Sequence, residues 1–198
     1  MRAGQAILFL IAGWVFALPG SSAQASPITW DFAGEVTFVL DPANRLEGAV
    51  AVGSTFSGSY TFESTALDSD PRAERGVYAV SAFSGRVGEL SYSLDSDGII
   101  VVEDDFLSPT LDTYVAGGLV GFVGEEIFSA GFILLDDTGQ VFDNDHLPVS
   151  LLTLDKFTFT QFSISIEAPD PSKDVFVGGE ITQFVPEPST LVLVTTCV

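Results

Sequence analysis

The chain has 198 residues, of which 46% are hydrophobic and only 17% are charged. This length allows a full hydrophobic core, and the composition does not fit a disordered chain, which is poor in apolar groups and rich in charge. The 27 acidic residues outnumber the 7 basic ones and give a formal net charge of −20. Because such a field repels phosphate backbones, we expect no nucleic-acid partner, whereas cations, neutral sugars and basic partners stay open.

The first 25 residues have the three parts of a secretory signal peptide. Arg2 supplies the positive charge, residues 6–18 form an uncharged apolar stretch, and Ala23 and Ala25 form the A-x-A cleavage signature. The apolar stretch is shorter than the roughly 20 residues that span a bilayer. We therefore expect signal peptidase to remove residues 1–25, cutting between Ala25 and Ser26, rather than a retained membrane anchor.

Hydrophobic and polar residues alternate with a period of two along five segments, as in strands with one wet face. Three continuous apolar runs, at 98–102, 118–124 and 130–135, are instead typical of strands buried on both faces. The residues expected on the apolar faces of the alternating segments are Ile28, Trp30 and Phe32; Val36, Phe38 and Leu40; Phe56, Tyr60 and Phe62; Leu90, Tyr92 and Leu94; and Phe162, Ile164 and Ile166.

Segments rich in Asp, Pro, Gly and Asn separate these runs, and such residues favour turns. Apart from the signal sequence, no stretch has sustained helical periodicity. Short strands with turns between them predict an all-β fold, a single antiparallel β-sandwich or jelly-roll-like domain over residues 26–184. We expect roughly ten strands, with boundaries uncertain by a few residues.

Few residues are suited to catalysis. The single histidine, His146, lies in a turn segment, no G-x-S-x-G motif is present, and the single cysteine, Cys197, is next to the end of the sequence. A Ser-His-Asp triad, a zinc site and an internal disulfide are therefore not expected. Two carboxylates of a glycoside hydrolase would suit this composition, but the sequence singles out no pair, so we expect a protein that is not an enzyme.

Calcium is the one cofactor that the acidic turns suggest, because Ca²⁺ takes oxygen ligands from carboxylates and carbonyls. The candidate ligands are Asp95 and Asp97 in one turn and Asp143, Asn144 and Asp145 in another. Neither turn matches the twelve-residue EF-hand loop, and plain Asx turns are the alternative explanation.

Residues 185–198 contain the sequence Val185, Pro186, Glu187, Pro188, Ser189 and Thr190, followed by a short apolar run. This segment resembles the C-terminal sorting signal of PEP-CTERM exported proteins of Gram-negative bacteria that make exopolysaccharide. The resemblance implies processing by the membrane protease exosortase. The apolar run after Pro188 is too short to span a bilayer and no basic residue follows it, so we expect no stable membrane span. A truncated signal and a released soluble form both stay open.

Together these patterns predict a protein exported to the periplasm, cell surface or extracellular matrix. We expect a non-enzymatic, exopolysaccharide-associated protein whose partners are signal peptidase, exosortase and a polysaccharide. A carbohydrate- or calcium-binding module is the alternative, and a glycoside hydrolase comes third.

Overall fold

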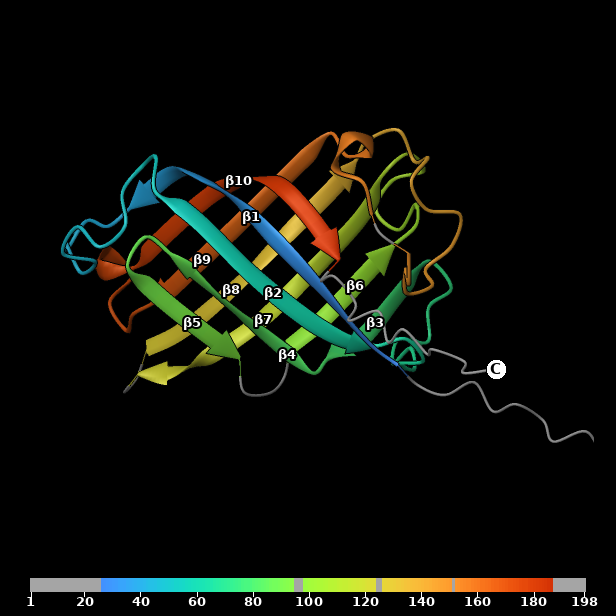
Figure 1. The fold of residues 1–198 in the computed structure, drawn as a ribbon, viewed down its shortest axis with the longest axis horizontal. Coiled ribbons are helices and arrows are strands. Elements are labelled where there is room, and N and C mark those ends of the chain that lie inside the picture. Colours follow the sequence, from blue (N-terminus) through green and yellow to red (C-terminus); the bar gives the residue numbers. More distant parts are fainter. Residues whose placement is uncertain (1–25, 95–97, 124–125, 151, 187–198) are drawn as a thin grey trace, which may run out of the picture.

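The computed structural model describes residues 26–94, 98–123, 126–150 and 152–186. The all-β prediction is confirmed: ten antiparallel strands form one sheet in the order β3-β6-β7-β8-β9-β10-β1-β2-β4-β5 (Figure 1). Only two short 3-10 helices, η1 (Leu154–Lys156) and η2 (Pro171–Lys173), occur among the described residues. The strands are β1 (Pro27–Leu40), β2 (Thr55–Glu63), β3 (Arg75–Val80), β4 (Ala82–Val87), β5 (Leu90–Leu94), β6 (Gly98–Glu103), β7 (Asp112–Val123), β8 (Glu126–Asp136), β9 (Phe159–Glu167) and β10 (Val175–Pro186).

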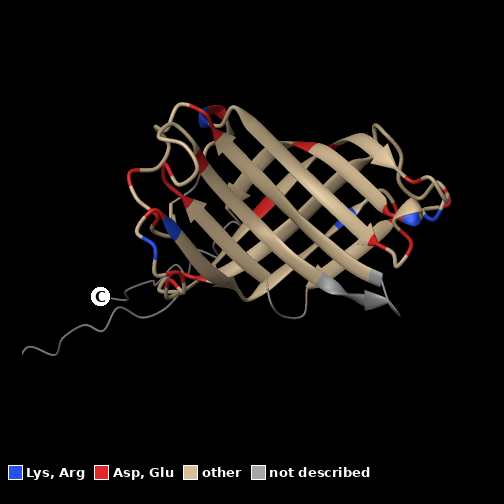
Figure 2. Cartoon of the chain, turned by 180° about the vertical axis from the view of Figure 1, so that it is seen from behind, with Lys and Arg blue, Asp and Glu red and all other residues tan. Residues whose placement is uncertain are grey.

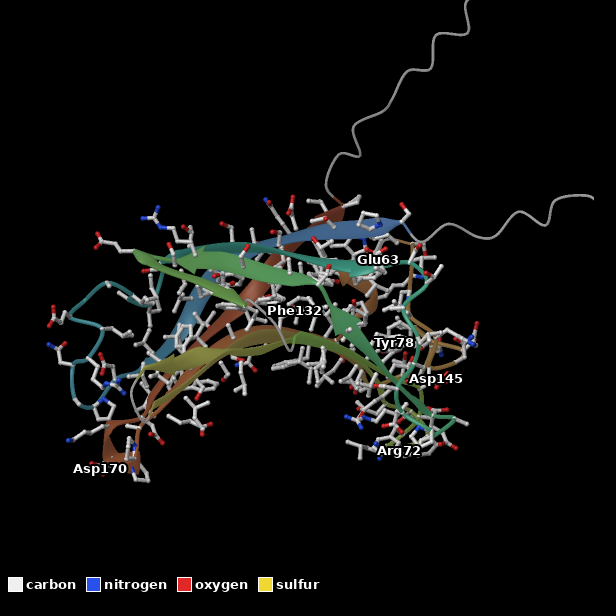
Figure 3. All side chains as sticks on the ribbon, turned by 90° about the horizontal axis from the view of Figure 1, so that it is seen from below. Glu63, Arg72, Tyr78, Phe132, Asp145 and Asp170 are labelled. Atoms are coloured by element: carbon white, nitrogen blue, oxygen red, sulfur yellow. The ribbon has the colours of Figure 1, made fainter. Side chains whose placement is uncertain are left out.

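The sheet curls until its two halves face each other, and the hydrophobic core fills the space between them. Figure 3 shows Phe132 of β8 between the two layers. Its ring lies 5.2 Å from that of Phe32 on β1, and the Phe56 ring of β2 stacks on Phe162 of β9 at 4.4 Å between centroids. The hydroxyls of Tyr60 (β2) and Tyr114 (β7) are 2.9 Å apart and bond across the same gap. Aromatic side chains therefore join strands that are far apart in the sheet order.

The predicted apolar faces are confirmed in four of the five alternating segments, where the named residues are buried or pack against the core. The fifth prediction, that Val36, Phe38 and Leu40 share a face, is wrong. Val36 is buried, but Phe38 and Leu40 are each 48% exposed and Val39 packs against the core instead. The cause is a register shift between β1 and β10 at Val36/Phe38, since one extra residue in a strand reverses the faces that follow it.

The prediction of strands buried on both faces is confirmed only in part for β6 and is wrong for the run at 130–135. In β6, Ile100 and Val102 belong to the core and Val101 on the opposite face is also buried, at 6% exposed, but Ile99 on that face is 42% exposed. In β8, Phe132 and Leu134 are buried while the residues between them are only half-buried. The reason is that the sheet forms both layers of the fold itself, so no second sheet covers its outer face among the described residues.

The first and last strands are neighbours, so the described chain begins and ends at the same place. In β1, Trp30 pairs with Pro186 and Asp31 pairs with Val185 of β10. The last strand thus continues two residues beyond the expected boundary at 184. No helix among the described residues is long and apolar enough to cross a membrane.

Candidate functional site

Acidic residues gather in the loops at the two ends of the strands, while the strands themselves carry few of them (Figure 2). One end is marked in Figure 3 by Arg72, Tyr78 and Asp145, and the opposite end by Asp170. The candidate site lies at the first of these ends, where β6 finishes and β7 begins.

Asp104, Asp105 and Asp112 form the cluster at this end. Asp104 and Asp105 directly follow β6, and Asp112 is the first residue of β7, so the connection between these paired strands brings them together. One carboxylate oxygen from each residue lies within 4.8 Å of the others. Asp105 is exposed, Asp104 is half-buried and Asp112 is fully buried, so the cluster extends from solvent into the fold.

The carboxylate of Asp112 is only half satisfied. Its Oδ2 accepts hydrogen bonds from the backbone N–H groups of Val141 and Phe142, both at 2.8 Å. Its Oδ1 is buried and has no hydrogen-bond partner among the described residues. A buried polar atom without a partner is costly and rare, and here it belongs to the side chain nearest the core.

Asp136 provides a comparison, because it pairs with Asp112 across β7 and β8 and is buried to the same degree, at 1% exposed against 0%. Its carboxylate accepts hydrogen bonds from the Thr138 backbone and hydroxyl and from the backbone of Gln140, at 2.8–3.0 Å. Burial raises the pKa of Asp136, but these hydrogen bonds outweigh it and leave the pKa below its usual value. Asp136 is therefore fully satisfied by the turn that it closes.

The local electrostatic field is negative. Burial raises the pKa of Asp104, and the carboxylates of Asp112 and Asp105 raise it further, as do those of Asp143 and Asp145. The nearby ion pairs of the described residues leave Asp112 out: Arg72 binds Asp70, and Arg75 binds both Asp70 and Glu103.

The calcium ligands expected from the sequence lie close to this cluster without joining it. Asp143 and Asn144 are exposed, and the Asn144 side-chain oxygen bonds with the backbone N–H and ring Nδ1 of His146, at 2.9 and 2.7 Å. The Asp145 backbone oxygen accepts from the hydroxyl of Tyr78 at 2.9 Å, which holds the turn against β3. Asp95 and Asp97, the cleavage-site residues Ala23 and Ala25, and motif residues 187–190 lie outside the described residues.

The Asp104–Asp105–Asp112 cluster was not among the sites predicted from the sequence, although one signal for it exists. Asp112 alternates with Tyr114 and Ala116, which both face the core, so the pattern assigns Asp112 to the inner face of a strand. A carboxylate at such a position requires a compensating partner.

At Asp112 the geometry favours cation binding over sugar hydrolysis. A glycoside hydrolase uses two carboxyl groups that flank the scissile bond, and the fully buried Asp112 is not accessible to a sugar. An ion is small enough to lie among the three carboxylates.

A second feature is a groove of about 590 Å³ that is lined by residues of η1, β9 and β10. Its lining combines hydroxyl, amide and carboxylate side chains with an aromatic ring: Thr37, Phe159, Thr160, Gln161 and Glu180. Phe159 is 45% exposed there. Polar groups beside an accessible ring suit a polyhydroxyl ligand.

No protein-family model, no curated protein and no solved structure matches this chain.

Proposed function

We propose that this chain is exported and serves as a non-catalytic protein of the cell surface or exopolysaccharide matrix of a Gram-negative bacterium. Signal peptidase removes residues 1–25, and the PEP-CTERM-like segment at 185–198 serves as the address that exosortase recognises.

The proposal is supported by the position of the folded strands between the expected signal peptide and the PEP-CTERM-like segment. β1 begins at Pro27, just after the expected cleavage site, and β10 ends at Pro186, inside the Pro-Glu-Pro motif. The backbone of Ser26 already bonds with Ser64: its oxygen accepts from Ser64 N–H at 3.0 Å, and its N–H donates to Ser64 Oγ at 3.2 Å. Cleavage after Ala25 therefore leaves every described strand and its hydrogen bonds intact.

Export is tested by expressing the full chain in a Gram-negative host and measuring intact masses in each cell fraction. We expect a periplasmic or secreted product that starts at Ser26. The variant Ala25→Phe should stay uncut, because the A-x-A signature needs a small residue at that position, whereas Gln24→Phe at the tolerant middle position should be cut normally. A cytoplasmic product that keeps Met1 would overturn the proposal.

The tail is tested in a host with exosortase and in the same host without it. We expect Glu187→Ala to change the tail processing or surface retention only in the host with exosortase. Identical behaviour of the variant and the parent chain in both hosts would rule out the sorting role while leaving export untouched.

The groove lined by η1, β9 and β10 favours a second candidate function, a carbohydrate-binding module. Phe159 offers an exposed ring, and Gln161 and Glu180 offer hydrogen-bonding groups beside it. We expect retention on purified exopolysaccharide that Phe159→Ala reduces, while Phe38→Ala, which removes an exposed ring outside the groove lining, leaves it unchanged. Equal retention of both variants would exclude the groove.

A further inference from the structure

The unsatisfied Oδ1 of Asp112 is the most unusual polar atom of the described chain. Among the buried side-chain oxygen and nitrogen atoms of the described residues, only this atom and the hydroxyl of Tyr92 have no hydrogen-bond partner. The Tyr92 hydroxyl is neutral, but Asp112 belongs to an acidic cluster and its second oxygen already accepts two backbone hydrogen bonds. What is missing at Oδ1 is therefore a donor or a cation.

The surrounding carboxylates supply no donor in their ionised form, and they fit a cation. Asp104 and Asp105 both place an oxygen within 4.8 Å of an Asp112 oxygen, and neither supplies a proton in its ionised form. Asp105 is held in the left-handed backbone region with φ 54°, and its Oδ1 lies against Gly139, where an added Cβ would be only 3.1 Å from it. The loops thus hold like charges together instead of letting them separate into solvent.

The ligand chemistry identifies the ion class. All three groups are carboxylates, hard oxygen ligands that suit calcium, magnesium or manganese and not the softer metals that select cysteine or histidine. Calcium binds oxygens at 2.3–2.6 Å, so two ligands on opposite sides of one ion are about 4.6–5.2 Å apart, which accommodates the observed separations. Calcium also accepts irregular arrangements, whereas magnesium demands a near-ideal octahedron.

We propose that Asp104, Asp105 and Asp112 bind one calcium ion at the end of the sheet where β6 passes into β7. Asp112 contributes Oδ1 from the buried side, Asp105 contributes from the solvent side, and water completes the coordination shell. The ion joins the β6–β7 connection to the 141–142 segment, because Oδ2 of Asp112 already holds that segment. This inference goes beyond the proposed function and does not depend on it.

The proposal is tested on the purified full chain, stripped with chelator, by calorimetric titration with calcium and by thermal unfolding with and without it. We expect about one calcium per chain and a higher melting temperature in calcium. The variant Asp105→Asn should bind about tenfold more weakly or worse, since it removes a charged ligand. Asp137→Asn, which removes the same charge from the exposed neighbouring turn, should bind like the parent chain.

Asp112→Asn gives the sharpest readout, because the amide oxygen still accepts from Val141 and Phe142 while the charge is lost. In chelator, this variant should melt at or above the temperature of the parent chain, since it removes a buried like charge. In calcium, the order should reverse.

Several results would overturn the proposal. One is the absence of both a heat of binding and a shift in melting temperature at millimolar calcium. Another is an equal effect of magnesium and calcium. A third is equal weakening of calcium binding by Asp105→Asn and Asp137→Asn, which would mean diffuse attraction to an acidic surface. If Asp112→Asn lowers the melting temperature by the same amount with and without calcium, Asp112 has only a structural role.

Discussion

Three of the four tyrosines of the core should make this protein unfold steeply in alkali. Tyr60, Tyr92 and Tyr114 are all 5% exposed or less. Burial raises the pKa of each hydroxyl above the ordinary 10.0, and the charge and hydrogen bond of Tyr114 raise the pKa of Tyr60 further. In Tyr114 the hydrogen bond from Tyr60 offsets part of the rise without cancelling it.

The sign follows from proton binding. Below pH 10 these tyrosines are protonated in both the folded and the unfolded chain, so they contribute no pH dependence. Above pH 10 the unfolded chain releases their protons and the folded chain keeps them, so the free energy of unfolding falls as pH rises. Each tyrosine contributes about 1.4 kcal/mol per pH unit, which gives about 2 kcal/mol each at pH 11.5 and about 6 kcal/mol for the three together. That loss is comparable with the whole stability of a small domain, about 5–15 kcal/mol.

The assay is urea unfolding followed by tryptophan fluorescence at intervals between pH 8 and pH 11.5. The variant Tyr92→Phe should lower the slope above pH 10 by the share of one tyrosine, about 1.4 kcal/mol per pH unit. At pH 8 it should change stability little, because the Tyr92 hydroxyl has no hydrogen-bond partner to lose. A stability that stays flat up to pH 11.5, or a slope that Tyr92→Phe leaves unchanged, would show that these hydroxyls are not buried as described.

Four further single substitutions and one double variant test the packing, each by chemical unfolding at neutral pH. Tyr114→Phe leaves the Tyr60 hydroxyl buried without its partner and should lower the free energy of unfolding by about 1–3 kcal/mol. The double variant with Tyr60→Phe and Tyr114→Phe should recover most of this loss, because neither hydroxyl then remains. Gly179→Ala should cost about 1–3 kcal/mol, because its Cβ would lie 2.6 Å from the ring of Phe56. Gly178→Ala should cost less, because the closest atom to its Cβ is the end of the Gln161 side chain at 3.1 Å. Phe38→Ser should change stability by less than about 0.5 kcal/mol if Phe38 lies on the outer face.

The local alternation of residues predicted most of the fold because each strand has one face in the same aromatic core. It failed in the second half of β1, where Val36 is buried and Phe38 is not. The register shift there arises between β1 and β10, segments at opposite ends of the sequence, so no local pattern contains it. Hydrophobicity also predicted too much burial for the run at 130–135 and for Ile99 of β6, because it does not say whether a second layer covers a sheet.

The acidic cluster could be predicted only in part, for a related reason. That Asp112 faces inward follows from its alternation with Tyr114, but its lack of a donor depends on how the 141–142 segment and the β6–β7 connection meet around it. The predicted ligands Asp143 and Asp145 are near enough to raise the pKa of Asp104, so they lie at the same end of the molecule as the cluster.

Turn formation explains part of the strongly acidic composition, and Asp112 differs from the aspartates that close turns. Many aspartates close turns by accepting backbone N–H groups: Asp41 accepts from Arg45 and Leu46, and Asp136 accepts from Thr138 and Gln140. Such residues add negative charge as a by-product of turn formation, without any ligand. Asp112 differs because it is buried at the start of a strand, closes no turn of its own and has one oxygen without a partner. The case for a bound cation therefore rests on Asp112 and its two neighbours, and not on the net charge of the chain.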